Sequence, residues 1–268
     1  MHASSPPLLD ARRADAADGP AVIVSLATAA VRATPMHSHA RGQAIGAVSG
    51  LLAVSTQGER LIVPPGHVLW MPPAHPHGLD AHGPASAWSA HVAAHACAAL
   101  PARPQVMAVS GLLREAVARA AAWRALAVLD AAQARVCAVI LDEIAAAPRP
   151  PLVLPMPRER RLRAIALALA EHPADPRTLT EWAAWAGITP RTLTRRYTAE
   201  TGLAFSAWRQ RARLLRSLEL LAVGQPVTTV ALELGYDSLS AFIAMFRRAM
   251  GVSPGAYVDG QGRTGHPG

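Results

Sequence analysis

An internal repeat in the C-terminal third constrains the fold of this chain more than any other feature. Residues 179–208 align with residues 227–257 when one residue is inserted in a turn. Self-similarity over such a length indicates a duplicated supersecondary unit. The matched pairs are Ala183 with Ala231, Gly187 with Gly235, Thr189 with Ser238, Leu193 with Phe242, Tyr197 with Phe246, and Gly202 with Gly251.

Each copy has the pattern of two short helices joined by a tight turn. In the first copy, Gly187 can end a helix, because glycine adopts the left-handed conformation at little steric cost. The Thr189 hydroxyl can cap the next helix, and Pro190 is tolerated at its first position. Leu193 and Tyr197, four residues apart, share the inward face. This pattern is typical of a helix-turn-helix, whose second helix enters a major groove.

The second helix of the first copy has a basic and polar outward face. Arginine can donate to two acceptors on a guanine edge, and a helix N-terminus can hold a phosphate. An ordinary solvated face is the alternative interpretation, but the duplicated turn with matched caps favours DNA binding. We expect DNA contacts from Thr189, Arg191, Thr192, Thr194, Arg195 and Arg196.

The stretch between the two copies, residues 207–223, predicts one connecting helix. It carries four arginines and one acid, Glu219. We expect some of these arginines, Arg209 among them, to contact backbone phosphate and others to pair with Glu219. The four arginines are Arg209, Arg211, Arg213 and Arg216.

Charge and composition divide the chain at a proline-rich stretch. Residues 156–268 hold 15 arginines against 9 acids, whereas residues 1–155 hold 11 arginines against 9 acids. The net charge of +8 favours a polyanionic partner such as nucleic acid. Eight of the 11 histidines lie between His37 and His95. Since proline cannot continue a helix, residues 148–157 are predicted to be a linker between two regions.

The region before this linker changes from strands to helices. Short, partly β-branched stretches punctuated by glycine and proline predict a small sandwich or barrel. The strands are expected at Ala21–Ala27, Ala44–Ser55, Arg60–Val63, His67–Met71 and Ala87–Val92. From Ser110 the period becomes helical, with apolar stripes running through Leu113 and Ile140. Each stripe either packs against the strands or forms a dimer seam, since both need only an apolar face.

Several classes of protein are excluded or disfavoured. No apolar run reaches 18 residues without a charge or a proline, so we expect no membrane span. The N-terminus lacks a cationic start followed by an apolar stretch, and it is interpreted as a disordered tail rather than a signal peptide. Two cysteines, Cys97 and Cys137, cannot form a disulfide framework, so a reducing cytoplasm is the expected location.

The segment from about Arg160 to Tyr257 resembles the DNA-binding domain of the AraC/XylS family of bacterial transcription regulators. Three runs carry the resemblance: residues 187–193, Tyr197 with residues 200–202, and residues 235–254. The family implies two helix-turn-helix units on one long helix, reading neighbouring major-groove segments. By this match the base-reading positions are Arg191, Thr194 and Arg195, then Leu239, Ser240, Ala241 and Ala244.

The second copy departs from that pattern. Ala244 stands where Arg195 stands in the first copy, and a methyl group cannot hydrogen-bond to guanine. The second unit is therefore expected to grip phosphate through Ser238, Arg247 and Arg248.

The histidine-rich region resembles the two cupin motifs. His37-Ser38-His39 with Gln43 matches the first motif, and Gly66, Pro72, Ala74 and His77 match the second. Gln43 stands in the carboxylate position and Ala74 in a glycine position. Within the AraC/XylS family, residues 37–70 and 109–115 also resemble a subgroup whose regulators often control a nearby exporter.

The cupin resemblance implies a metal set of His37, His39, Gln43 and His77. Three neutral imidazoles can hold Zn²⁺, Ni²⁺, Cu²⁺ or Fe²⁺. Alternatively, the same residues line an effector pocket without metal, together with Trp70. Further possible ligands are His67, His75, His82, His91, His95 and Cys97.

Three functions follow as hypotheses: a regulator responding to a small molecule, a metal-responsive regulator, and a cupin oxygenase with a DNA-binding tail. The enzyme hypothesis lacks the carboxylate ligand, so we expect no enzyme. The expected partners are operator DNA, the effector, a second copy of the chain, and RNA polymerase if transcription is activated; no membrane is expected.

The fold class is α+β multidomain, with an N-terminal cupin-like β-barrel and a C-terminal all-α domain. The expected boundaries are tail 1–18, cupin-like domain 19–105, helical coupling segment 106–147, linker 148–157, DNA-binding domain 158–260 and tail 261–268.

Overall fold

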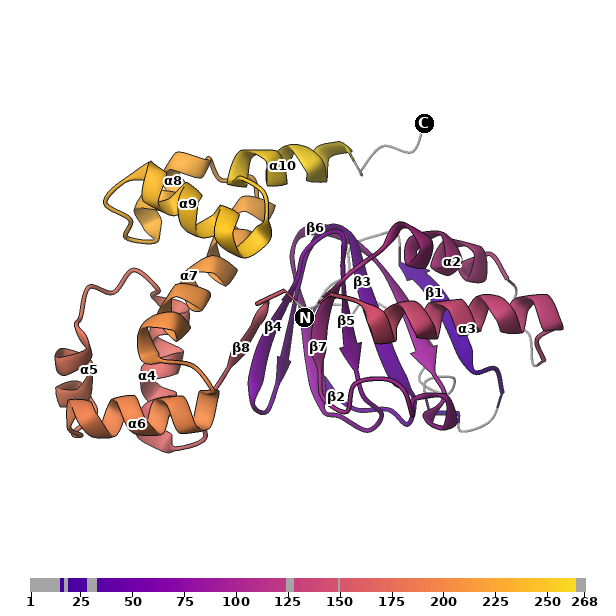
Figure 1. Cartoon of the computed structure of the whole chain (residues 1–268), viewed down its shortest axis with the longest axis horizontal. Coiled ribbons are helices and arrows are strands. Elements are labelled where there is room, and N and C mark those ends of the chain that lie inside the picture. Colours follow the sequence, from indigo (N-terminus) through magenta and orange to yellow (C-terminus); the bar gives the residue numbers. More distant parts are fainter. Residues whose placement is uncertain (1–14, 17–18, 28–32, 124–127, 149, 264–268) are drawn as a thin grey trace, which may run out of the picture. The chain divides into compact units, whose positions relative to one another are not determined.

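The computed structural model describes residues 15–16, 19–27, 33–123, 128–148 and 150–263 (Figure 1). These residues form two compact units. The first comprises residues up to 57 and residues 61–150, and the second comprises residues 58–60 and 151–263. Most of the two expected tails lies outside the described residues, although helix α10 extends to Arg263, beyond the boundary expected at residue 260.

The first unit is an antiparallel sheet in which two long strands, β3 and β6, pair along most of their lengths. Their register runs from Gly42 opposite Val92 to Thr56 opposite His77, with irregularities near Ser49. The strands of this unit are β1 (Val22–Ala27), β2 (Thr34–His37), β3 (Gly42–Thr56), β4 (Glu59–Val63), β5 (His67–Met71), β6 (His77–Val92) and β7 (Gln105–Ala108).

The two ends of β3 and β6 have different neighbours. The first half of β3 pairs with β5, and the second half of β6 pairs with β1. The beginning of β6 pairs instead with β2, where His37 lies opposite His77. Each long strand therefore connects two differently paired parts of the sheet.

Side chains alternate between the two faces of these strands, because the strand period is two residues. Ala44 lies opposite Trp70 and Ala90, and this face belongs to the core packed against the helices. Gln43, one residue earlier, lies opposite His91 and points to the other face. The register thus separates the apolar, helix-covered face from the face that carries Gln43 and His91.

Two helices follow β7. Helix α2 (Gly111–Ala121) is capped by Ser110, and helix α3 (Ala131–Ala146) begins with a capping box between Asp130 and Gln133. Their apolar stripes are buried in one core cluster with strand residues such as Trp88. The sequence left open whether these stripes pack against the strands or form a dimer seam. In the structure they pack against the strands of the same chain.

The structure corrects several expected boundaries. Strands β2 and β7 were absent from the prediction, and β6 begins ten residues before the expected Ala87. The segment expected to be helical from residue 106 begins as β7, and the linker contains strand β8 (Val153–Pro155). A Pro-rich segment can still pair at a sheet edge, where the N–H that proline lacks is not needed.

The second unit is helical and contains the predicted duplication. Helices α5 and α6 form the first helix-turn-helix, α8 and α9 form the second, and α7 connects them (Figure 1). The bounds are α4 (Arg160–Glu171), α5 (Leu179–Trp185), α6 (Pro190–Thr201), α7 (Phe205–Ala222), α8 (Val227–Glu233), α9 (Leu239–Met250) and α10 (Pro254–Arg263).

The turn and cap chemistry of the two copies agrees with the prediction. Gly187 and Gly235 have φ of 64° and 71°, in the left-handed region that favours glycine. The matched inward residues Leu193, Tyr197 and Phe242 are fully buried. The duplicated sequence therefore forms duplicated structure because the same caps and core positions recur.

Candidate DNA-binding surface and histidine site

Helix α6 presents the predicted basic face to solvent. The Thr189 hydroxyl accepts a hydrogen bond from the Thr192 backbone N–H at 3.2 Å and donates to the Thr192 hydroxyl at 3.0 Å, so both residues form the helix cap. Arg191, Arg195 and Arg196 are exposed, and within the described part of the chain they have no hydrogen-bond or ion-pair partner. Three unpaired guanidinium groups on one exposed helix are suited to phosphate and guanine acceptors.

Thr194 lies on the same exposed helix. Its hydroxyl donates to the Pro190 carbonyl at 3.0 Å, which leaves the oxygen lone pairs available as acceptors. It can therefore accept from a base donor but has already used its own proton.

Helix α9 is different at the matched positions. Ser238 caps the helix by accepting from the Ala241 N–H at 3.2 Å. Leu239, Ser240 and Ala244 are exposed, and only Ser240 among these three can hydrogen-bond through its side chain. Basic groups appear only in the last turn, at Arg247 and Arg248. The two copies thus share a backbone but present different chemistry.

The expected phosphate contact of Arg209 is not supported. Its guanidinium donates to the carbonyl of Arg177 at 2.8 Å and to the carbonyl of Asp175. Arg213 similarly donates to the Pro173 carbonyl at 3.0 Å. These side chains hold α7 against the segment between α4 and α5, so some of their N–H donors are used within the protein.

Arg216 forms the ion pair with Glu219 that was expected for some arginines of this helix. It pairs with Glu219 at 3.0 Å, and Glu219 is also paired with Arg60 at 2.6 Å. Because Glu219 is buried, two cationic partners satisfy a carboxylate that would be costly to bury alone.

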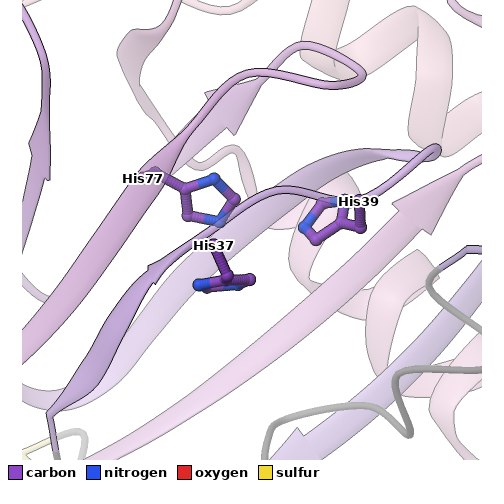
Figure 2. A group of neighbouring side chains, drawn as sticks. All are labelled: His37, His39 and His77. Carbon is purple, nitrogen blue, oxygen red and sulfur yellow. The ribbon is translucent and has the colours of Figure 1, made fainter.

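Three of the predicted histidines lie together in the first unit (Figure 2). His37 ends β2, His39 lies in the connection to β3, and His77 begins β6. The ring centroids of His37 and His77 are 4.4 Å apart, and those of His39 and His77 are 5.2 Å apart. One nitrogen from each ring lies within 4.8 Å of the others. His37 is exposed, whereas the other two are buried, so the group opens to solvent on one side.

Backbone carbonyls fix the orientation of all three rings. The Nδ1 atoms of His37, His39 and His77 lie 2.9, 2.6 and 2.8 Å from the carbonyl oxygens of Pro35, Arg41 and His75, respectively. A carbonyl oxygen only accepts, so each Nδ1 carries the proton and donates it. In the neutral ring the Nε2 atom then has a free lone pair.

Gln43 completes this group. Its Oε1 lies 3.0 Å from His39 Nε2 and 3.2 Å from His77 Nε2. Its Nε2 donates to the Ser89 hydroxyl at 2.8 Å. The structure therefore brings together all four residues of the predicted metal set.

A fourth histidine, His91, is buried and lies opposite Gln43 on the neighbouring strand. Its ring centroid is 5.4 Å from that of His39, and its Nδ1 is 3.4 Å from the Ser89 hydroxyl. Burial lowers the pKa of His91 to about 3 and the pKa of His77 to about 4. Both rings are consequently neutral near pH 7. His91 was among the further possible ligands expected from the sequence, and its register opposite Gln43 is what distinguishes it from the others.

Trp70 does not line this site, which corrects the prediction. It lies on the helix-covered face, and its indole N–H donates to the Pro101 carbonyl at 2.8 Å. Of the further possible ligands, His67 donates from Nδ1 to the Pro65 carbonyl, and the Cys97 thiol donates to the carbonyls of Val92 and Ala93. The His82 side chain lies outside the described residues, and His75, His95, His67 and Cys97 are not members of the three-histidine group.

The residues present fit a transition-metal ion. Three imidazole nitrogens and one amide oxygen are donors that zinc-like ions accept, and each ligating histidine has a carbonyl partner on its other nitrogen. None of these four donors carries a charge at neutral pH when the rings are neutral.

No helix among the described residues has the length and apolarity needed to span a bilayer.

Comparison with known proteins agrees with both units. The model of a helix-turn-helix domain matches residues 182–260, and that of an AraC-like ligand binding domain matches residues 19–144. The chain is 30% identical over 225 residues to the HTH-type transcriptional regulator NimR of Escherichia coli (strain K12), covering 84% of this chain and 82% of that protein.

Two other similarities concern the DNA-binding part. The HTH-type transcriptional regulator RipA of Corynebacterium glutamicum is 37% identical over 116 residues, which cover 42% of this chain and 35% of RipA. The solved DNA-binding domain of AdpA in complex with a target DNA is 32% identical, covers 39% of this chain and 96% of that domain, and has a TM-score of 0.36. The relatives are transcriptional regulators, and the oxygenase hypothesis has no support among them. From the duplicated helix-turn-helix, the ligand-binding domain and these relatives, the chain belongs to the AraC family of DNA-binding transcriptional regulators.

Proposed function

We propose that this regulator responds to an effector held by His37, His39, Gln43 and His77, and that effector binding changes how its second unit binds operator DNA. The observation that carries this proposal is the convergence of four polar side chains in the ligand-binding unit, three of which are buried. Burying polar side chains costs free energy of folding. A convergent set of them in a ligand-binding domain is therefore suited to holding a ligand.

In this proposal the two helix-turn-helix units read DNA in different ways. Arg191, Thr194 and Arg195 on α6 hydrogen-bond to base edges. On α9, Leu239 and Ala244 offer apolar contact, which suits thymine methyl groups rather than guanine. Arg247 and Arg248 bind phosphate and thereby set the register without reading sequence.

The remaining elements of the proposal concern partners. The chain acts as a homodimer at an operator near its own gene, and an exporter gene is among the targets. The effector is a small molecule or a divalent metal ion. If the chain activates transcription, RNA polymerase is a further partner.

A reporter carrying the DNA upstream of this gene tests the proposal. The reporter strain is exposed to a panel of zinc, nickel, copper and iron salts and to a panel of small organic compounds. The compound that changes reporter output in the wild type is then applied to His39→Ala and His77→Ala. We expect the response to be lost while binding to upstream DNA in gel shift is kept. The matched control is His95→Ala, because His95 is exposed and outside the histidine group.

An unchanged response in both site variants would contradict the proposal. The effector would then bind elsewhere, and an apolar cavity of about 430 Å³ lined by Ala21, Leu129 and Leu141 would be the next site to test.

A further inference from the structure

We propose that residues 173–177 bridge the two helix-turn-helix units and fix the distance between helices α6 and α9, with Arg213 as the positioning residue. This inference concerns the DNA-binding unit alone, so it does not rest on the effector proposed above. Helix α7 connects the two helix-turn-helix units, and both pack against it. A helix can bend and twist, so a second connection beside α7 restricts how the two units move relative to each other.

The 173–177 segment lies along α7. Arg213 donates from Nε to the carbonyl of Pro173 at 3.0 Å. Arg209 donates to the carbonyl of Arg177 at 2.8 Å and also to the carbonyl of Asp175. The two donors are four residues apart, so they share one face of α7. Because the acceptor number rises as the donor number falls, the segment runs antiparallel to the helix over about one turn.

The beginning of the segment contacts the turn of the second helix-turn-helix unit. A Cβ at Gly235 would lie 3.3 Å from both the Cβ and the carbonyl oxygen of Ala174, so this turn rests on the segment. The Arg213 guanidinium lies over the ring of Tyr236, 5.4 Å from its centroid. The Tyr236 ring in turn lies 5.5 Å from that of Phe242, which is fully buried in the second unit. One planar group thus donates to a carbonyl of the segment and stacks on the second unit.

The end of the segment is held by the first helix-turn-helix unit. The Arg177 guanidinium lies 3.7 Å from the ring centroid of Trp182, a fully buried residue of α5. The same guanidinium pairs with the Asp175 carboxylate at 2.7 Å, which fixes the fold of the segment from within. Thr178, the next residue, caps α5. The segment is therefore continuous with the first unit and in contact with the second.

Only one of the two matched turns takes part in this bridge. A Cβ at Gly187, in the turn of the first unit, would have no heavy atom within 4 Å. The repeat alone thus does not require the contact at Gly235, because the equivalent turn is built without one. The contact arises where the chain brings residue 174 against the second copy.

The bridge has a consequence for DNA binding. Two units that are held at a fixed distance lose less conformational freedom when α6 and α9 both enter the DNA. Loss of the bridge should leave each unit folded, widen the range of distances between the units and weaken binding to DNA.

The test measures the distance between the units in the full chain. Cys97→Ala and Cys137→Ala remove the native thiols, and nitroxide labels are attached at Ala199→Cys on α6 and Leu232→Cys on α8, both exposed positions. Pulsed electron paramagnetic resonance should give one narrow distance distribution for this reference chain. Arg213→Ala and Tyr236→Leu should each broaden it by about twofold, because each removes the stacking contact. Arg160→Ala is the matched control, since it removes an exposed arginine of α4 and should keep the distribution narrow.

Fluorescence anisotropy with labelled upstream DNA separates this role from a phosphate contact. Arg213→Ala should weaken binding by about 10-fold with an unchanged salt dependence. A phosphate contact would instead lower the slope of log affinity against log salt by about one.

Circular dichroism shows that each labelled variant is folded. Distance distributions as narrow as that of the reference in folded Arg213→Ala and Tyr236→Leu would overturn the inference. A reduced salt slope for Arg213→Ala would overturn it as well, because Arg213 would then act on the DNA directly. Neither outcome affects the effector proposal, which the reporter assay tests separately.

Discussion

Alanine at the two turn glycines should destabilise the helix-turn-helix units by different amounts, although the sequence repeat makes them equivalent. A Cβ at Gly187 would have no heavy atom within 4 Å, whereas a Cβ at Gly235 would lie 3.3 Å from both the Cβ and the carbonyl oxygen of Ala174. Both glycines have φ in the left-handed region, at 64° and 71°. Conformational strain is thus common to both substitutions, and crowding is added only at Gly235.

The expected magnitudes follow from these two contributions. Left-handed alanine costs about 1–2 kcal/mol, and the loss of unfolded-state freedom returns about 0.4–1 kcal/mol. Gly187→Ala should therefore lower the free energy of unfolding by about 0.5–1 kcal/mol. Crowding against Ala174 adds roughly 1 kcal/mol, at the low end for overpacking, so Gly235→Ala should lower it by about 2 kcal/mol.

Urea unfolding followed by far-ultraviolet circular dichroism on the full chain measures both variants, because the helical unit dominates the signal. The Gly235→Ala midpoint should be lower than that of Gly187→Ala, with equal slopes. Equal midpoints, or a lower midpoint for Gly187→Ala, would refute the reasoning from the Ala174 contact.

Three further outcomes are expected. Arg195→Ala should weaken specific DNA binding by about 1–3 kcal/mol and relax preference at one base pair in binding-site selection; unchanged preference would remove α6 as the reading helix. Ala74, a non-glycine residue with φ of 57°, should be relieved of strain in Ala74→Gly, which should raise the free energy of unfolding by about 0.5–1 kcal/mol; a lower urea midpoint would contradict this. Burial lowers the pKa values of His77 and His91 to about 4 and about 3, so the unfolded chain binds more protons below pH 6.5. The stability of the metal-free first unit should therefore be full above pH 6.5 and should fall as the pH drops toward 4; a flat profile would show that these rings are not buried as neutral groups.

The sequence predicted the DNA-binding unit well because its signals are local. Caps such as Thr189 and turn glycines such as Gly187 act within a few residues, and the repeat supplies each signal twice. The internal contacts of Arg209 were not predicted, because its acceptors, the carbonyls of Asp175 and Arg177, are more than 30 residues away along the chain. A basic residue on a predicted helix has no local signal that separates a phosphate contact from an internal one.

For the histidine site, the sequence predicted correctly only the residues that lie in the two cupin motifs. His37, His39, Gln43 and His77 stand at fixed spacings, and the fold brings them together. Trp70 was misplaced because the face of a strand residue depends on register, and the pairing of Ala44 with Trp70 is not local information. His91 was named only as one of several further possible ligands for the same reason, since its pairing opposite Gln43 is what places it beside the site.

Occupancy of the histidine site is proposed to control DNA binding. Fluorescence anisotropy with labelled upstream DNA measures this directly, using the EDTA-stripped chain with and without a saturating amount of the metal salt or compound that changes reporter output. This effector should change the dissociation constant several-fold for the wild type and for His95→Ala, and leave it unchanged for His77→Ala. Identical dissociation constants for the wild type with and without the effector, with effector binding confirmed by calorimetry, would contradict the proposal.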